Sequence, residues 1–186
     1  MSPEIPDDCD LLFLYAPTSD ITDDEKTIIE KYLSDGGKVY LILGDTTSDT
    51  PNLDGIMSDY GLKKVSGYIA DTQRCYQGNY YAIFPQLSLS GDLGSGISNQ
   101  MVLLLNSPGM EKTDTDNDNL TVTPFMQTSD SGYAVTENDQ TQGQYILGAV
   151  STNAISADSS DSDSEDEDDK SDATDTDTKT ARLTVR

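Results

Sequence analysis

The stretch from Cys9 to Asp45 constrains the fold most strongly, because it has the pattern of a strand, a helix and a second strand. Leu11 to Tyr15 and Val39 to Leu43 are unbroken apolar runs of strand length, which is typical of strands buried on both faces. Two such strands joined by a helix form a parallel βαβ unit, which is right-handed in nearly every known case.

The helix between these two strands has clear start and stop signals. Thr22 followed by Glu25 is a capping-box pattern, which predicts that the helix begins there. Gly36 and Gly37 supply the left-handed backbone that ends a helix.

Later segments extend the α/β pattern over the rest of the chain. Thr50-Pro51 begins a second, short helix that Gly61 ends. Further strands are predicted at Leu62 to Ile69, Tyr80 to Phe84, Met101 to Leu105, Leu120 to Met126, Tyr145 to Val150 and Ala181 to Val185, the last two as a pair. We expect a single α/β domain over residues 1–186, and its unclosed last strand indicates an excised fragment.

A strongly acidic segment separates the last two strands. Between Ser156 and Thr180 the chain carries eleven acidic residues and two lysines. Such a segment buries too little apolar surface to offset its ordering entropy. We therefore predict a disordered acidic insertion loop over residues 152–180, carried by a late β-hairpin and serving chiefly as a solvated spacer.

The whole chain is acidic, with a formal net charge of −23. This charge argues against nucleic acid or an anionic membrane surface as a partner. The sequence contains neither an apolar run of about 18 residues, which a membrane-spanning helix needs, nor the layout of a signal peptide.

Histidine is missing from the sequence, which excludes Ser-His and Cys-His catalysis and His-ligated metals. The two cysteines, Cys9 and Cys75, are interpreted as separate buried thiols, with a disulfide as the alternative. No cofactor is predicted.

The best candidate for a ligand or contact site lies where the two parallel strands end. Ligands of open α/β sheets bind beyond the carboxyl ends of the strands. At that edge the sequence places Thr18, Ser19 and Asp20 in one loop and Asp45, Thr46 and Thr47 in the next. The alternative is that these side chains only form turns and helix caps in two solvated loops.

Two other functions were weighed from the residues. A hydrolase or transferase would use the turn at Asp45 and Thr46, but no base is available to activate that threonine. Asp114, Asp116 and Asp118 imitate half of a calcium loop, but Asn119 and Phe125 stand where a glycine and a bidentate glutamate are needed. The segment is therefore interpreted as a polar hairpin tip, with weak calcium binding as the alternative.

Several stretches resemble one protein family in sequence and order. They are residues 5–17 (IPDDCDLLFLYAP), 19–25 (SDITDDE), 31–38 (KYLSDGGK), 52–62 (NLDGIMSDYGL), 124–129 (PFMQTS) and 143–150 (GQYILGAV). Together they resemble the extracytoplasmic domain of gliding-motility-type (GldG-like) ABC transporter auxiliary proteins.

The resemblance implies a flavodoxin-like or class I glutamine-amidotransferase-like fold, with a mostly parallel sheet flanked by helices. It further implies a non-enzymatic auxiliary domain on the extracytoplasmic face of the bacterial cell membrane. Such a domain would contact a permease or a ligand in an ABC transport system that also contains an ATPase. It would be anchored to the membrane through segments outside this chain.

Overall fold

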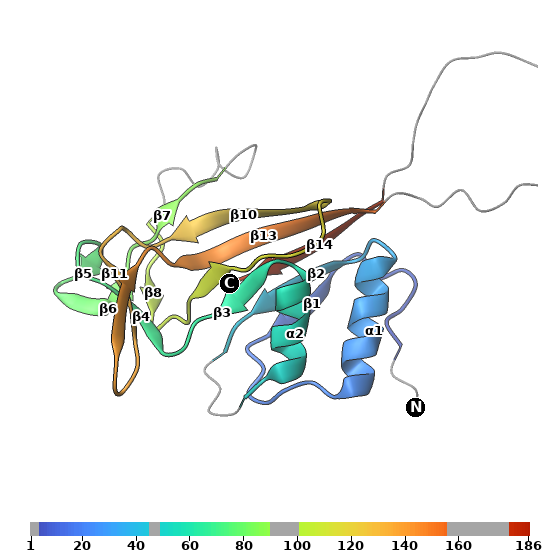
Figure 1. Cartoon of the computed structure of the whole chain (residues 1–186), viewed down its shortest axis with the longest axis horizontal. Coiled ribbons are helices and arrows are strands. Elements are labelled where there is room, and N and C mark those ends of the chain that lie inside the picture. Colours follow the sequence, from blue (N-terminus) through green and yellow to red (C-terminus); the bar gives the residue numbers. More distant parts are fainter. Residues whose placement is uncertain (1–3, 45–48, 90–100, 156–178) are drawn as a thin grey trace, which may run out of the picture.

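The computed structural model describes residues 4–44, 49–89, 101–155 and 179–186. In these residues the chain forms two helices and fourteen strands (Figure 1). The helices are α1 (Asp23–Ser34) and α2 (Pro51–Asp59). The strands are β1 (Leu12–Tyr15), β2 (Lys38–Ile42), β3 (Leu62–Lys64), β4 (Tyr68–Asp71), β5 (Cys75–Tyr76), β6 (Asn79–Ile83), β7 (Gln86–Leu87), β8 (Leu104–Leu105), β9 (Met110–Lys112), β10 (Leu120–Gln127), β11 (Gly132–Val135), β12 (Gln140–Gly143), β13 (Ile146–Ile155) and β14 (Lys179–Val185).

The main sheet has the strand order β1-β2-β14-β13-β10-β7, and β3 and β9 join it beside β13. The predicted parallel βαβ unit is confirmed, since β1 pairs with β2 in parallel register. The predicted late pairing is also confirmed, because β14 runs antiparallel to β13. On its other side β14 pairs in parallel with β2, so the last strand joins the βαβ unit to the antiparallel strands.

The predicted fold class is wrong. Of the described residues, 43% lie in strands and 14% in helices, and every strand pair among them outside β1–β2–β14 is antiparallel. The fold is therefore mostly β with mixed sheets, and not a flavodoxin-like or amidotransferase-like sheet flanked by helices. The error arose because the βαβ pattern was extended to a chain whose remaining strands are mostly two to four residues long.

Both predicted helices are present, and the signals that begin the first one act as expected. The Thr22 hydroxyl accepts from the Glu25 N–H at 3.2 Å, and the Glu25 carboxylate accepts from the Thr22 N–H at 2.8 Å. Each bond satisfies a backbone donor that the first turn leaves free. The Thr22 N–H and the Thr22 hydroxyl both donate to the Glu25 carboxylate, and these bonds hold the pKa of Glu25 below its usual range.

The prediction that β1 is buried on both faces is wrong. Leu12 and Leu14 face the helices, whereas Phe13 and Tyr15 on the opposite face are 52% and 73% exposed. β1 is an edge strand, and α1 and α2 lie on one face of the sheet only (Figure 1). The apolar run Met101 to Leu105 is likewise not a buried strand, since only its last two residues form β8 and Leu105 is exposed.

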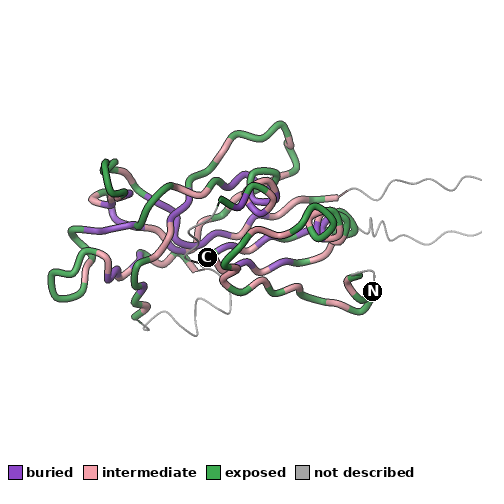
Figure 2. The backbone as a smooth tube through the Cα atoms, turned by 90° about the horizontal axis from the view of Figure 1, so that it is seen from below, coloured by how far each residue is buried: buried purple, intermediate pink, exposed green. Residues whose placement is uncertain are grey.

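The core consists of two apolar clusters. The first lies between the helices and β2, β14 and β13, and includes Leu33, Leu41, Met57 and Leu183. The second lies where β4, β6, β8, β10, β11 and β13 meet, and includes Ile69, Ile83 and Leu147. Figure 2 shows buried segments along the strands and exposed segments at the outer loops.

Most of the predicted acidic loop lies outside the described residues. The flanking strands extend further than predicted, to Ile155 on one side and from Lys179 on the other, so the bounds 152 and 180 fall within paired strands. Cys9 and Cys75 are separate free thiols as predicted, but both are half-buried. In the described part of the chain no helix has the length and apolar character needed to cross a membrane.

Candidate functional site

A groove of about 320 Å³ lies at the sheet edge where the sequence predicted a site. The carboxyl ends of β1, β2 and β14 form one wall, and residues 104–108 form the other. The three strand ends meet because the strands are parallel to one another. Backbone bonds hold them together, from Ala16 N–H to Ile42 O at 2.9 Å and from Arg186 N–H to Leu41 O at 2.9 Å.

The backbone around this groove is strained. Ala16 and Asn106, which line it, have φ values of 43° and 46°, in the left-handed region that residues with a side chain rarely adopt. Gly44 lies so close to Ala16 that an added Cβ would be 2.9 Å from its carbonyl carbon. Strain of this kind costs about 1–3 kcal/mol per residue and clusters at binding sites.

The groove is lined by apolar and by charged side chains. Among the described residues that line it, Tyr15 and Leu105 present exposed apolar surface and Arg186 presents the charge. None of these described lining residues is an aspartate, a glutamate, a cysteine or a lysine. A second hollow of about 230 Å³ shares Gly44 and Pro108 with the groove and adds Lys64.

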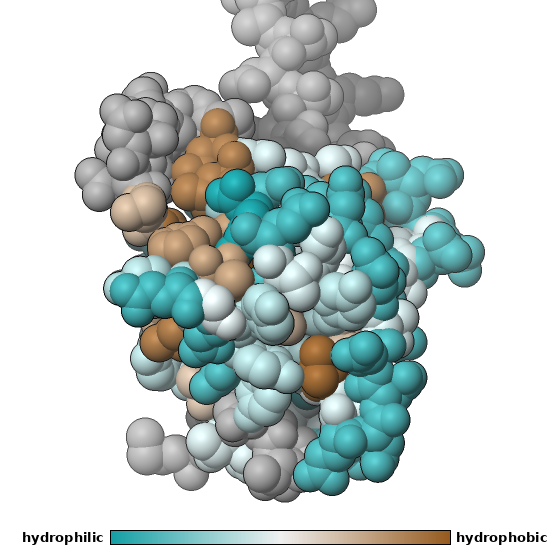
Figure 3. Space-filling view, turned by 90° about the vertical axis from the view of Figure 1, so that its left-hand side faces the viewer, coloured by the Kyte–Doolittle hydropathy of each residue, from teal (hydrophilic) through white to brown (hydrophobic). Residues whose placement is uncertain are grey.

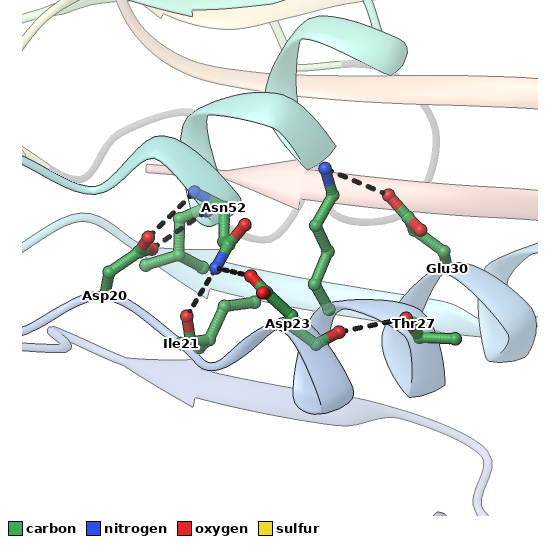
Figure 4. Close-up of polar contacts among 8 residues, drawn as sticks. Asp20, Ile21, Asp23, Thr27, Glu30 and Asn52 are labelled. Atoms are coloured by element: carbon green, nitrogen blue, oxygen red, sulfur yellow. Dashed lines mark hydrogen bonds and ion pairs between the residues drawn. The ribbon is translucent and has the colours of Figure 1, made fainter.

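Asp20, one of the predicted site residues, is engaged by the start of α2. Its carboxylate accepts from the Asn52 N–H at 2.8 Å and the Leu53 N–H at 3.1 Å (Figure 4). The adjacent Thr50 makes no capping bond of its own, so Asp20 caps the helix from a distant loop. The Asn52 side chain donates back to Ile21 O at 2.8 Å, which fixes the loop on the helix.

The other predicted residues have two outcomes. Thr18 and Ser19 are exposed beside Asp20 and are free to contact a partner. Asp45, Thr46 and Thr47 lie outside the described residues. The second wall of the groove comes from residues 104–108, of which the sequence predicted only 104 and 105, as the end of a strand.

The loop that carries the three candidate metal-ligating aspartates leads from β9 to β10. Asp114, Asp116 and Asp118 are all exposed, and the described residues contain no cluster of three acidic, cysteine or histidine side chains suited to a metal. The loop joins β9 to β10, which do not pair with each other, so the prediction of a hairpin tip is wrong. Its turns are shaped by Asn117, whose side-chain oxygen accepts from the Asn119 N–H at 3.0 Å.

A fully buried carboxylate, Asp71, was missed from the sequence. It accepts from the Ser129 N–H at 2.7 Å, the Ser129 hydroxyl at 2.8 Å, the Gln73 N–H at 2.9 Å and the Arg74 N–H at 2.8 Å. Burial raises the pKa of Asp71, but these four bonds outweigh it and hold the pKa below the usual range. We call these four bonds the polar lock. They join β4 to the Thr128-Ser129 turn, and Asp71 and Ser129 are 58 residues apart in the sequence.

Another hollow, of about 600 Å³, lies between residues 4–9 and α1. Two polar contacts lie along it, since Lys31 Nζ is 2.6 Å from the Asp35 carboxylate and the Tyr32 hydroxyl donates to Cys9 O at 2.9 Å. Burial raises the pKa of Tyr32, so its hydroxyl stays protonated. Glu4 and Asp7 add two further carboxylates to its lining.

Comparisons with known proteins agree with the sequence motifs. Residues 1–165 match the family described as an ABC-type uncharacterized transport system. A solved structure, "mmIFT52 N-terminal domain", is similar to the chain with a TM-score of 0.54 and 11% identity. The similarity covers 95% of this chain and 64% of that structure, so the chain spans less than two thirds of its length. At this identity the likeness shows the fold alone. No curated protein matches the chain.

Proposed function

The chain belongs to the family of the ABC-type uncharacterized transport system, and from this premise we propose that it is a non-enzymatic binding domain within that system. Membership of this family supports a role as an auxiliary component of an ABC-type transport system. The finer proposal is that the domain contacts the permease, or a ligand delivered to it, through the groove at the carboxyl edge of β1, β2 and β14.

The observation that carries this proposal is the composition of the groove. Its strained turns at Ala16 and Asn106 bring exposed Tyr15 and Leu105 to one surface. A surface of this kind favours contact with a polypeptide or an apolar ligand, whereas a hydrolase needs a nucleophile beside a base. The described residues that line the groove hold no such pair.

The location and the partners are proposed from the resemblance to GldG-like auxiliary proteins. We propose that the domain lies on the extracytoplasmic face of a bacterial membrane, held there by segments outside this chain. A permease and an ATPase of the same system are the proposed partners. Topology reporters on either side of the domain in the full-length protein test the location, and a cytoplasmic signal from both would contradict it.

The contact is tested by isolating the full-length protein from membranes and measuring how much permease and ATPase come with it. Leu105→Glu places a charge in the groove at a side chain that is 65% exposed, so folding is preserved while the contact is lost. Tyr80→Glu, at a position of β6 that is 50% exposed and does not line the groove, is the control. Equal recovery of both subunits with the two variants would contradict the proposed surface.

A further inference from the structure

The sheet face opposite α1 and α2 is built like one side of an interface. Parallel strands are almost always covered on both faces. In the described residues, however, β1, β2 and β14 have helices on one face only. Register places Phe13, Tyr40 and Thr184 in one row of the uncovered side, with Tyr15 and Ile42 in the next, and we call this side the open face.

The apolar part of the open face is preorganised. The Phe13 ring stacks on Tyr40 with centroids 5.2 Å apart and on Tyr15 at 6.2 Å. Phe13, Tyr15 and the preceding Leu11 are each more than half exposed. Stacked aromatic side chains lose little freedom on binding, and such anchors dominate interface energetics.

The open face carries positive side chains, whereas the chain as a whole is strongly negative. None of the 34 acidic residues lies in β1, β2, β14, β13 or β10. Lys38 and Arg182 are direct neighbours on β2 and β14 and point to the open face, and both are exposed. Neither forms an ion pair with any described residue. Two like charges side by side on adjacent strands destabilise a sheet unless an anion joins them.

We propose that the open face docks an amphipathic helix of a partner subunit, with an apolar stripe that packs on Phe13, Tyr15 and Tyr40 and carboxylates that pair with Lys38 and Arg182. A second copy of the chain suits this face less, because it would bring a net charge of −23 against another −23. The inference rests on the proposed function in one respect, that the transport system supplies a partner protein. It concerns a surface that adjoins the groove at Tyr15.

The chain contains no tryptophan, which makes a selective reporter available. Phe13→Trp places a single fluorophore on the open face, and Tyr80→Trp places one at a similarly exposed site at the other end of the molecule. The probes are two synthetic helices of about 18 residues with the same leucine stripe, one flanked by glutamates and the other by lysines.

We expect the glutamate-flanked helix to shift the emission of the Phe13→Trp chain to the blue and to saturate, and to leave the Tyr80→Trp chain unchanged. Adding Lys38→Glu and Arg182→Glu should weaken this binding roughly tenfold, because two ion pairs become two repulsions. These results would support the proposal.

Four results would overturn it. The first is no emission shift with the glutamate-flanked helix, and the second is a shift that survives Lys38→Glu together with Arg182→Glu. The third is an emission shift that depends on protein concentration and comes with a dimer mass in sedimentation, which would assign the face to a second copy of the chain. The fourth is binding that appears only after residues 156–178 are deleted, which would assign the face to the chain's own acidic segment. Equal recovery of permease and ATPase with Leu105→Glu and Tyr80→Glu, which would contradict the proposed function, would leave these fluorescence results unchanged, so failure of the proposed function is distinguishable from failure of this inference.

Discussion

The two ends of this molecule are held together in different ways. The α/β end, formed by β1, α1, β2, α2 and β14, has a large apolar cluster beneath two amphipathic helices. The all-β end, formed by β4, β5, β6, β8, β11 and β12, has a smaller apolar cluster and a buried polar lock at Asp71. Figure 3 looks onto the all-β end, where apolar surface gathers on one side and polar surface covers much of the rest.

The difference shows how each end obtains a unique structure. At the α/β end, helix caps and apolar runs determine the elements locally, and burial of their apolar faces joins them. At the all-β end, strands of two to five residues have little local preference. Their arrangement depends on hydrogen bonds between distant residues, such as Asp71 with Ser129 and Tyr145 N–H with Thr128 Oγ1 at 2.9 Å.

The largest effect is expected from Asp71→Ala. It removes the acceptor of four hydrogen bonds and leaves the buried Ser129 N–H and hydroxyl unsatisfied. We expect a loss of about 4 kcal/mol in the free energy of unfolding, measured by urea denaturation. Asp118→Ala, in an exposed loop, is the control and should change it by less than about 0.5 kcal/mol. Equal effects of the two substitutions would refute the polar lock.

Leu183→Ala tests the other end of the comparison. Leu183 is fully buried at the centre of the α/β cluster, so its truncation should cost about 3 kcal/mol through lost burial and a cavity. In hydrogen exchange, the substitution should accelerate exchange of the amides in α1 and α2 more than of those in β11 and β12. If exchange became faster to the same extent at both ends, the two ends would not be stabilised by different interactions.

A smaller effect is expected in acid. The pKa of Asp71 is held below its ordinary value of 3.8 in the folded state, so folding favours its charged form. Its stabilising contribution is therefore present above about pH 4 and is lost as the pH falls through the lowered folded pKa. The urea midpoint of the wild-type chain should fall more steeply below about pH 4 than that of Asp71→Asn. Parallel acid profiles would rule out this linkage.

The smallest effect is expected from Asp20→Ala, which removes the cap of α2. A loss of about 1 kcal/mol is expected, because two N–H groups at the start of the helix lose their acceptor. Ser19→Ala, at the exposed neighbouring position, is the control. If both variants were as stable as the wild-type chain, Asp20 would be available to a ligand instead.

The sequence predicted those features that depend on neighbouring residues. The capping box at Thr22, both helices and the parallel pairing of β1 with β2 follow from local signals. Whether an apolar run is buried on one face or both depends on what covers it, so Phe13 and Tyr15 were placed in the core although they face outward. The mixed sheet was missed because short strands and contacts 58 residues apart, such as Asp71 with Ser129, leave no local pattern.

A groove lies at the sheet edge where the sequence predicted a ligand or contact site, and its use as such a site stays a prediction. Its second wall, residues 104–108, comes from a part of the chain whose position only the tertiary fold determines. Asp20 has the capping role that was the alternative to ligand binding, and a ligand role for Thr18 and Ser19 stays a prediction.

Hydrogen–deuterium exchange on the full-length protein, alone and in the isolated transport complex, tests the central claim most directly. If the groove and the open face are the contact surfaces of an auxiliary domain, residues 11–16, 38–44, 104–108 and 182–186 should exchange more slowly in the complex. The β11–β12 hairpin at the all-β end should exchange at the same rate in both samples. Protection confined to that hairpin, or the same exchange throughout, would contradict the account.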